Sequence, residues 1–196
     1  MVLKLINYEF CKLQLEHLYK GEVLIHASAV CKNGKSIIFC GPTESGKTRY
    51  MIDFCKKGWK CLGDDFVLIK DGYIYSCFLE GCHMKYEKGV KIPIKKLPLH
   101  YFYNIVRTLT NRRPHIFLTP KELGFEIAFK AKLDKIVFLN TEGDNITEKV
   151  FNNTYIKGDF WKYEDGDYLG KLYDIIKENL NENTLVETTI DLARQL

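Results

Sequence analysis

One octapeptide constrains the fold of this chain more than any other stretch: Gly41-Pro42-Thr43-Glu44-Ser45-Gly46-Lys47-Thr48. Its two glycines, its lysine and its threonine have the spacing GxxxxGK(S/T). An apolar run over residues 36–40 leads directly into it, and apolar residues recur at helical spacing after it until Gly58. The sequence therefore predicts a strand, a glycine-rich turn and a helix that follow one another without a break.

The composition of the octapeptide is that of a phosphate-binding loop. Glycines let successive backbone N–H groups converge on phosphate oxygens, and the N-terminus of the following helix adds its positive dipole end. Lys47 supplies a positive charge for the β and γ oxygens, and the Thr48 hydroxyl is a ligand for Mg²⁺. We therefore expect ATP and Mg²⁺ as cofactors, held by Gly41, Pro42, Thr43, Glu44, Ser45, Gly46, Lys47 and Thr48.

The stretches around the octapeptide predict an α/β fold with a mixed sheet and hairpins. The dipeptides Asn33-Gly34 and Asp71-Gly72 are strong hairpin signals. They join pairs of apolar, β-branched stretches that we predict to be strands. The predicted strands are residues 22–31, 36–40, 60–63, 66–70 and 73–77.

Two adjacent carboxylates, Asp64-Asp65, follow the predicted strand at 60–63. A nucleotide site needs an acidic residue at the end of a neighbouring strand, where it holds the metal ion or orients the reacting groups. One helix and one strand separate the pair from Thr48, so the pair can reach the loop. The alternative interpretation is an ordinary polar turn between strands.

The order of these features resembles the catalytic core of HPr kinase/phosphorylase and, more distantly, phosphoenolpyruvate carboxykinase. The resemblance covers residues 21–72. It comprises His26 in a strand, a hairpin, the GPTESGKT loop, a helix ending at Lys57-Gly58-Trp59, and Leu62-Gly63-Asp64-Asp65. It implies a P-loop kinase core with a mixed sheet. It also implies phosphoryl transfer from a nucleotide to a hydroxyl, usually of a serine or threonine in a protein.

The resemblance also implies roles for individual residues. It places the general base at Asp64, next to the phosphate-binding Lys47. Because a carboxylate bound to Mg²⁺ is a poor base, Asp65 is then expected at the metal ion together with Thr48. His26 occupies the position of the family's histidine, and a hydrogen-bonded core histidine is the competing interpretation.

The chain also departs from the pattern of the bifunctional enzymes. Their glycine-rich ExRGxG signature has its nearest counterpart in Leu79-Glu80-Gly81-Cys82, which lacks the arginine. This departure favours an alternative function, a nucleotide-gated binding or regulatory module without phosphoryl transfer. A third hypothesis is a small-molecule enzyme closer to phosphoenolpyruvate carboxykinase. No NKxD motif follows the loop, which argues against a GTPase.

Charge is distributed unevenly along the chain. Residues 84–113 contain eight basic residues and one acidic residue, Glu87, whereas residues 141–196 contain twelve acidic and six basic residues. The first stretch predicts a basic surface that attracts an acidic acceptor, such as a peptide or protein; a solvated face is the alternative. It has no helix-turn-helix, zinc-knuckle or RNP pattern, so nucleic acid is not an expected partner. A homo-oligomer is left open.

The remaining sequence predicts ordinary structural elements in a single domain over residues 1–196, because no repeat or linker divides the chain. We expect a short helix at 118–124 with Pro120 in its first turn, a strand at 135–139, a helix at 172–180 and a loop at 88–98.

The seven cysteines contain no CxxC pair, which indicates reduced thiols rather than a zinc site. No apolar stretch approaches the ~20 residues of a membrane span. No signal peptide is recognisable at the N-terminus. We therefore expect a cytoplasmic protein.

Overall fold

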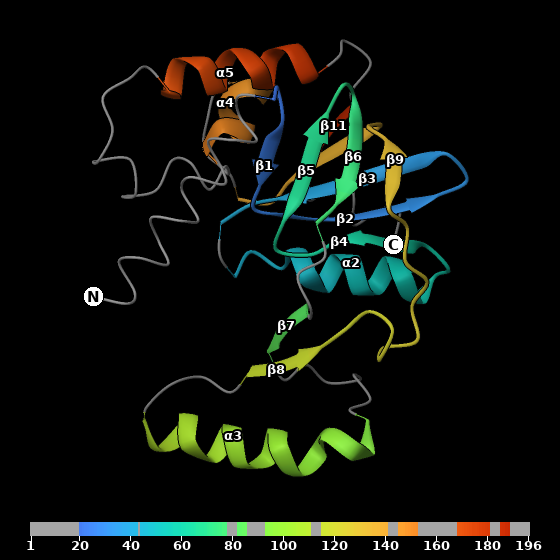
Figure 1. Cartoon of the computed structure of the whole chain (residues 1–196), viewed down its shortest axis with the longest axis vertical. Helices are drawn as coiled ribbons and strands as arrows, with labels where there is room; N and C mark the ends of the chain where they lie inside the picture. Colours follow the sequence, from blue (N-terminus) through green and yellow to red (C-terminus); the bar gives the residue numbers. More distant parts are fainter. Residues whose placement is uncertain are drawn as a thin grey trace.

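The computed structural model describes residues 20–42, 44–77, 82–85, 93–110, 115–140, 145–152, 168–180 and 185–188. Over these ranges the chain has a mixed α/β fold with two large sheets (Figure 1). Several predicted features lie outside the described residues, among them Thr43, residues 79–81, Lys88, Lys91, Arg112 and Arg113. Within the described ranges, no helix has the length and apolar character needed to cross a bilayer.

The larger sheet has five strands and is mixed, as the sequence predicts. Three neighbouring strands run parallel, namely β11 (Leu185–Thr188), β10 (Lys135–Phe138) and β3 (Lys35–Cys40). On the other side of β3 lies β2 (Ala27–Lys32), and β4 (Lys60–Gly63) follows β2 at the edge of the sheet; β2 is antiparallel to both β3 and β4. The helix α2 (Lys47–Lys56) packs on one face of this sheet (Figure 1).

The last four residues of the central strand β3, residues 37–40, are all apolar, and both faces of the strand are buried there. Ile37 and Phe39 belong to a core cluster that includes α2. Ile38 and Cys40 point to the opposite face and belong to a second cluster, between the two sheets. A strand buried on both faces has a continuous apolar run instead of an alternating pattern. In β3 this run ends at Cys40, directly before Gly41.

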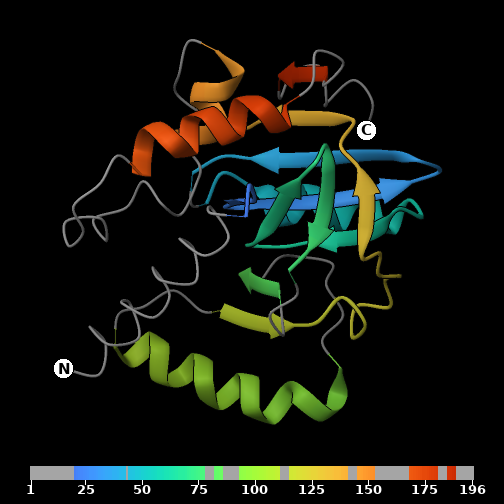
Figure 2. The same ribbon diagram turned by 45° about the horizontal axis from the view of Figure 1, so that its top comes forward.

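The second sheet stacks against the face of the first sheet that α2 does not cover (Figure 2). Its order is β1 (Val23–Ile25), β5 (Val67–Lys70), β6 (Tyr73–Ser76) and β9 (Lys130–Lys132), and all its pairs are antiparallel. The helices α4 (Ile146–Asn152) and α5 (Tyr168–Asn179) pack on each other and extend the core between the sheets.

A separate layer lies beyond α2. There β7 (Cys82–Lys85) pairs antiparallel with β8 (His115–Leu118). The short η1 (Ile94–Lys96) leads into α3 (Leu97–Leu109), which lies at the far end of the molecule from α5 (Figure 1). The loop predicted at 88–98 is therefore wrong for residues 94–98. Pro98 is tolerated because the first turn of a helix has N–H groups without intrahelical partners.

Both predicted hairpins are confirmed. Asn33 and Gly34 have φ values of 52° and 77°, and Asp71 and Gly72 have φ values of 52° and 69°. Two consecutive positive φ values are what a two-residue type I′ turn requires, and they explain why these dipeptides predict the turns. The helix after the glycine loop and the strand at 60–63 are also confirmed. The strand predicted at 135–139 is observed as Lys135–Phe138, and the helix predicted at 172–180 is observed as Tyr168–Asn179.

Two further predicted elements are wrong. The single strand expected at 22–31 is broken at His26, so that β1 joins one sheet and β2 joins the other. The helix expected at 118–124 is a hydrogen-bonded turn. Thr119 and Glu122 form a reciprocal capping pair there, but the chain leaves the turn at Gly124 (φ 77°) without a further helical turn.

Candidate active site

The glycine loop connects the end of β3 to the start of α2, and each fixed glycine is required by the backbone. A Cβ atom at Gly41 would collide with the carbonyl oxygen of Leu139, directly after β10, and would lie 2.6 Å from Ser45 Oγ. Gly46 caps the helix with a φ of 96°, a conformation that other residues adopt only with strain. The loop is therefore held tightly against the sheet, with the N-terminus of α2 at its end.

Lys47 is the first residue of α2, and its side chain lies over the loop. Its Nζ donates hydrogen bonds to the carbonyl oxygens of Gly41 (2.7 Å) and Pro42 (2.9 Å). The residue is only 6% exposed. Burial lowers the pKa of Lys47, and the negative charges of Asp65 and Asp64 oppose that shift. The loop thus fixes the ammonium group of Lys47 on its own carbonyl oxygens, within the electrostatic influence of Asp65 and Asp64.

The carboxylate of Asp64 joins the loop to the end of β4. Its Oδ1 accepts a hydrogen bond from Thr48 Oγ1 at 3.0 Å and a second from Ser28 Oγ at 2.7 Å. Ser28 is fully buried in β2, where its neighbours are apolar. A β-bulge between β2 and β4 at Ala29 and Val30 shifts the register beside this contact, as bulges next to active sites often do.

Asp65 lies beside His26. It has a φ of 63°, and a left-handed conformation at a non-glycine residue is associated with functional sites. Its Oδ1 lies 4.0 Å from His26 Nε2. Burial, with help from the charge of Lys47, lowers the pKa of His26 to about 4, against the opposing effect of Asp65. His26 is therefore neutral near pH 7, and its contact with Asp65 is not an ion pair.

Cys40 lies at the end of β3, immediately before the loop. It is fully buried, and burial raises its pKa to about 12. Its thiol therefore stays protonated at physiological pH, and a protonated buried thiol is a poor nucleophile. Cys40 packs as a small apolar residue under the loop.

The structure brings most of the predicted site residues together at one end of β3. Lys47, Thr48, Asp64, Asp65 and His26 are linked by the contacts described above. Elsewhere in the loop, Pro42 and Glu44 are exposed and Ser45 is half-buried. The Thr48 hydroxyl contacts Asp64, whereas Asp65 was expected beside Thr48 at the metal ion.

Ser28 is a site residue that the sequence patterns did not predict. Its only signal was a polar side chain in an otherwise apolar strand, two positions after a candidate histidine.

The oxygen atoms beside the loop fit Mg²⁺. This ion prefers oxygen ligands, usually one or two carboxylates completed by water and phosphate oxygens. Thr48 Oγ1 and Asp64 Oδ1 supply a hydroxyl and a carboxylate 3.0 Å apart. No group of three or more histidine, cysteine or acidic side chains forms a metal site among the described residues. A site that shares its ion with a bound triphosphate does not need such a group.

Fold and site together define a mixed α/β protein in which a glycine loop, a buried lysine and two strand-end carboxylates converge. No family model matches the chain, and a search of curated proteins finds no match. Among solved structures, the chain is similar to the HPr(Ser) kinase/phosphatase from Coxiella burnetii, with 12% sequence identity and a TM-score of 0.38. The match covers 59% of this chain and 58% of that protein. A likeness of this size assigns neither a family nor an activity.

Proposed function

We propose that this chain is an ATP-dependent kinase of the P-loop type, which transfers the γ-phosphoryl group of ATP to a hydroxyl group. The observation that carries the proposal is the 3.0 Å hydrogen bond from the Thr48 hydroxyl to Asp64. It joins the glycine loop to the acidic end of β4. The same two parts, a loop hydroxyl and a strand-end carboxylate, hold the metal ion and the triphosphate in P-loop enzymes.

Nucleotide binding falls to the loop and to α2. The backbone N–H groups of the loop and the N-terminus of α2 would bind the phosphates, as is general for helix N-termini that follow a glycine turn. Lys47 would exchange the carbonyls of Gly41 and Pro42 for the β and γ oxygens. Mg²⁺, when bound with ATP, supplies positive charge that offsets the charge of the phosphate oxygens. Thr48 and Asp64 are the residues that would hold it.

The contacts favour a division of labour between the two aspartates that is the reverse of the one expected from the resemblance. Asp64 shares its carboxylate with the Thr48 hydroxyl, so we assign Asp64 to the metal ion. Asp65 lies beside the neutral His26, so we assign it the role of general base, which takes the proton of the acceptor hydroxyl. His26 is proposed as the residue that orients Asp65.

The acceptor is proposed to be a serine or threonine of an acidic peptide or protein, or a small molecule with a hydroxyl group. The charge of residues 84–113 supports an acidic acceptor. The described part of this stretch contains Lys85 in β7, Lys95 in η1 and Arg107 in α3. Lys96 pairs with Glu122 at 2.6 Å. These cations lie in the layer beyond α2.

The experiment compares Lys47→Ala with Lys56→Ala. Lys56 is an exposed lysine in the last turn of the same helix, and it serves as the matched control. ATP–Mg²⁺ binding is measured by calorimetry, and transfer is measured as a mass shift of one phosphate on acidic serine-containing peptides. We expect Lys47→Ala to lose both activities and Lys56→Ala to keep both.

Two results would count against the proposal. Equal ATP affinity in Lys47→Ala would remove the nucleotide-binding assignment. Tight ATP binding by the unaltered chain with no transfer to any acceptor would favour the binding or regulatory module, to which the departure at residues 79–82 also points.

A further inference from the structure

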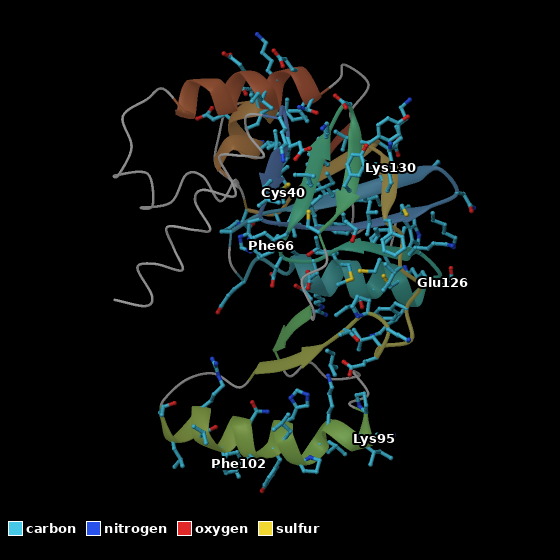
Figure 3. All side chains as sticks on the ribbon, viewed as in Figure 1. Cys40, Phe66, Lys95, Phe102, Glu126 and Lys130 are labelled. Carbon is cyan, nitrogen blue, oxygen red and sulfur yellow. The ribbon has the colours of Figure 1, made fainter. Side chains whose placement is uncertain are left out.

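The outward side of α3 is covered by large apolar side chains. Eight residues of η1 and α3 are between 42% and 83% exposed: Ile94, Leu97, Leu99, Tyr101, Phe102, Ile105, Val106 and Leu109. Polar residues lie on the opposite side, where His100 is 7% exposed and Lys96 pairs with Glu122. The usual amphipathic arrangement is thus reversed, and Phe102 lies on the side of α3 away from the sheets (Figure 3).

The exposed surface is large enough for a stable interface. The eight exposed fractions amount to about five fully exposed side chains, or on the order of 750 Å² at ~150 Å² for each, because six of the eight are aliphatic and smaller than an aromatic residue. The largest apolar patch of a typical monomer covers ~300–600 Å². A stable protein–protein interface buries ~800 Å² on each partner. The patch on α3 therefore exceeds the largest apolar patch of a typical monomer and approaches the area that a stable interface buries on each partner.

The pattern of the patch favours another helix as its partner. Within α3, the exposed Leu99 and Val106 are seven residues apart, and so are Phe102 and Leu109. A seven-residue spacing places apolar side chains on one stripe along a helix, which is the arrangement that packs against a second helix. With 100° per residue, the exposed apolar residues span about 200° of the helix, so flanking residues widen the stripe on both sides.

The charge of the patch favours a second copy of this chain over an acidic protein or an anionic bilayer. Residues 93–110 contain no acidic residue, and their basic residues are Lys95, Lys96 and Arg107. On the helical wheel, Lys96 and Arg107 fall on the inward side with His100, which leaves Lys95 as the cation on the apolar side. A helix that binds a membrane surface has its basic residues accessible to lipid headgroups. In α3 and η1, Arg107 and Lys96 instead fall on the side that faces the rest of the protein.

We propose that α3 packs antiparallel against α3 of a second copy, in a dimer with two-fold symmetry. A two-fold interface uses the same patch on both subunits. The apolar side carries a single cation, Lys95, near one end, so two antiparallel copies keep their Lys95 side chains at opposite ends of the interface. Antiparallel packing also brings Lys95, near the N-terminus of one helix, close to the C-terminal end of the partner helix. A cation is favourable at that end because of the helix dipole.

The test compares Phe102→Glu with Phe129→Glu. Both phenylalanines are highly exposed, at 67% and 76%, but Phe129 precedes β9 and lies outside α3. The molar mass of the full chain is measured by light scattering coupled to size-exclusion chromatography between about 1 and 100 µM. We expect a dimer for the unaltered chain and for Phe129→Glu. Phe102→Glu should raise the Kd of the dimer at least about thirty-fold, as the loss of a central anchor does.

A folding control keeps the result interpretable. Circular dichroism should show unchanged helix content for Phe102→Glu, because its side chain is outside the core. If that variant does not fold, Leu109→Glu, at an 81% exposed position, replaces it. A monomer at 100 µM, or a dimer that Phe102→Glu and Leu109→Glu leave intact, would overturn the proposal. Binding of a monomer to phosphatidylserine vesicles through α3 would overturn it in favour of a bilayer.

Discussion

The buried hydrogen bond from Ser28 to Asp64 offers a sharp test of the proposed site. Ser28→Ala removes the donor of a 2.7 Å bond and leaves in place the hydrogen bond from Thr48 to the same Asp64 Oδ1. The alanine fits the space of the serine, so little strain is introduced. Because Asp64 would hold the metal ion, a less constrained carboxylate should bind Mg²⁺ more weakly. Ser28 is thus a positioning residue that acts through Asp64.

The magnitude follows from the geometry and burial of this bond. A hydrogen bond to a charged group contributes about 1.5–3 kcal/mol to the free energy of unfolding. For a chain of this length each kcal/mol lowers Tm by roughly 2–4 °C, so we expect a loss of about 3–12 °C. Loss of a residue that positions a metal ligand typically weakens metal affinity about 10–100-fold. The Mg²⁺ concentration that half-saturates ATP binding should rise by that factor.

Ser36→Ala is the matched control. Ser36 is also fully buried, in β3, and its Oγ bonds to the Lys132 carbonyl at 2.6 Å and to the Asp134 N–H at 3.1 Å. These bonds lie between β3 and the segment after β9, away from Asp64. The variant should lose a similar amount of stability without any change in Mg²⁺ dependence. It therefore separates a general loss of stability from an effect on the metal site.

The assay follows ATP binding by calorimetry as Mg²⁺ is varied, so it requires no acceptor. An unchanged half-saturating Mg²⁺ concentration in Ser28→Ala, together with a lowered Tm, would refute the link from Ser28 through Asp64 to the metal ion. A changed pH profile of transfer at saturating Mg²⁺ would instead return Asp64 to the role of general base.

Three further predictions concern the aspartates, the histidine and the basic surface. Asp65→Asn should keep ATP–Mg²⁺ binding, and its rate of transfer should fall by about 10²–10⁴-fold. In Asp64→Asn, excess Mg²⁺ should restore transfer. The opposite pattern in these rate measurements would exchange the roles of the two aspartates. Because the pKa of His26 is about 4 in the folded chain and 6.5 in the unfolded chain, the folded state binds fewer protons between these values. Urea unfolding should therefore show a free energy that falls by up to about 3 kcal/mol as pH is lowered from 6.5 to 4, and an equally steep fall in His26→Gln would contradict this cause. The KM for an acidic acceptor should rise with salt and in the double variant Lys95→Glu with Lys96→Glu, and a KM insensitive to both would identify a merely solvated face.

The parts of the fold that the sequence predicts correctly are those specified by local chemistry. Asn33-Gly34 and Asp71-Gly72 adopt positive φ values with little cost, so their turns are apparent without knowledge of tertiary contacts. The glycine loop is also specified locally, because a backbone turn of the anion-binding kind requires glycines at fixed positions, and the lysine and threonine follow at a fixed spacing. These features place the loop, α2 and β4 before any packing is known.

The wrong predictions depend on contacts between distant segments. At His26 the chain passes from one sheet to the other. No glycine or proline marks this break, so the local sequence does not predict it. The turn after Thr119 has the capping pair of a helix, but the following residues pair with Cys61 instead: Cys61 donates to the Glu126 carbonyl, and Ala128 donates to the Cys61 carbonyl. In the sequence, Ser28 is a small polar residue between apolar neighbours, and only its hydrogen bond to the distant Asp64 indicates a role in the site.

The close approach of Gly41 to the Leu139 carbonyl has an evolutionary consequence. Gly41 is required by the packing of the loop on the end of β10, whether or not a nucleotide binds. Lys47 is different, because burial of its ammonium disfavours the charged form, and a bound anion is what would compensate for that burial. In a lineage that lost nucleotide binding, selection would therefore maintain Gly41 while Lys47 drifted to an uncharged residue. Among divergent descendants, the lysine rather than the first glycine would distinguish active copies from inactive ones.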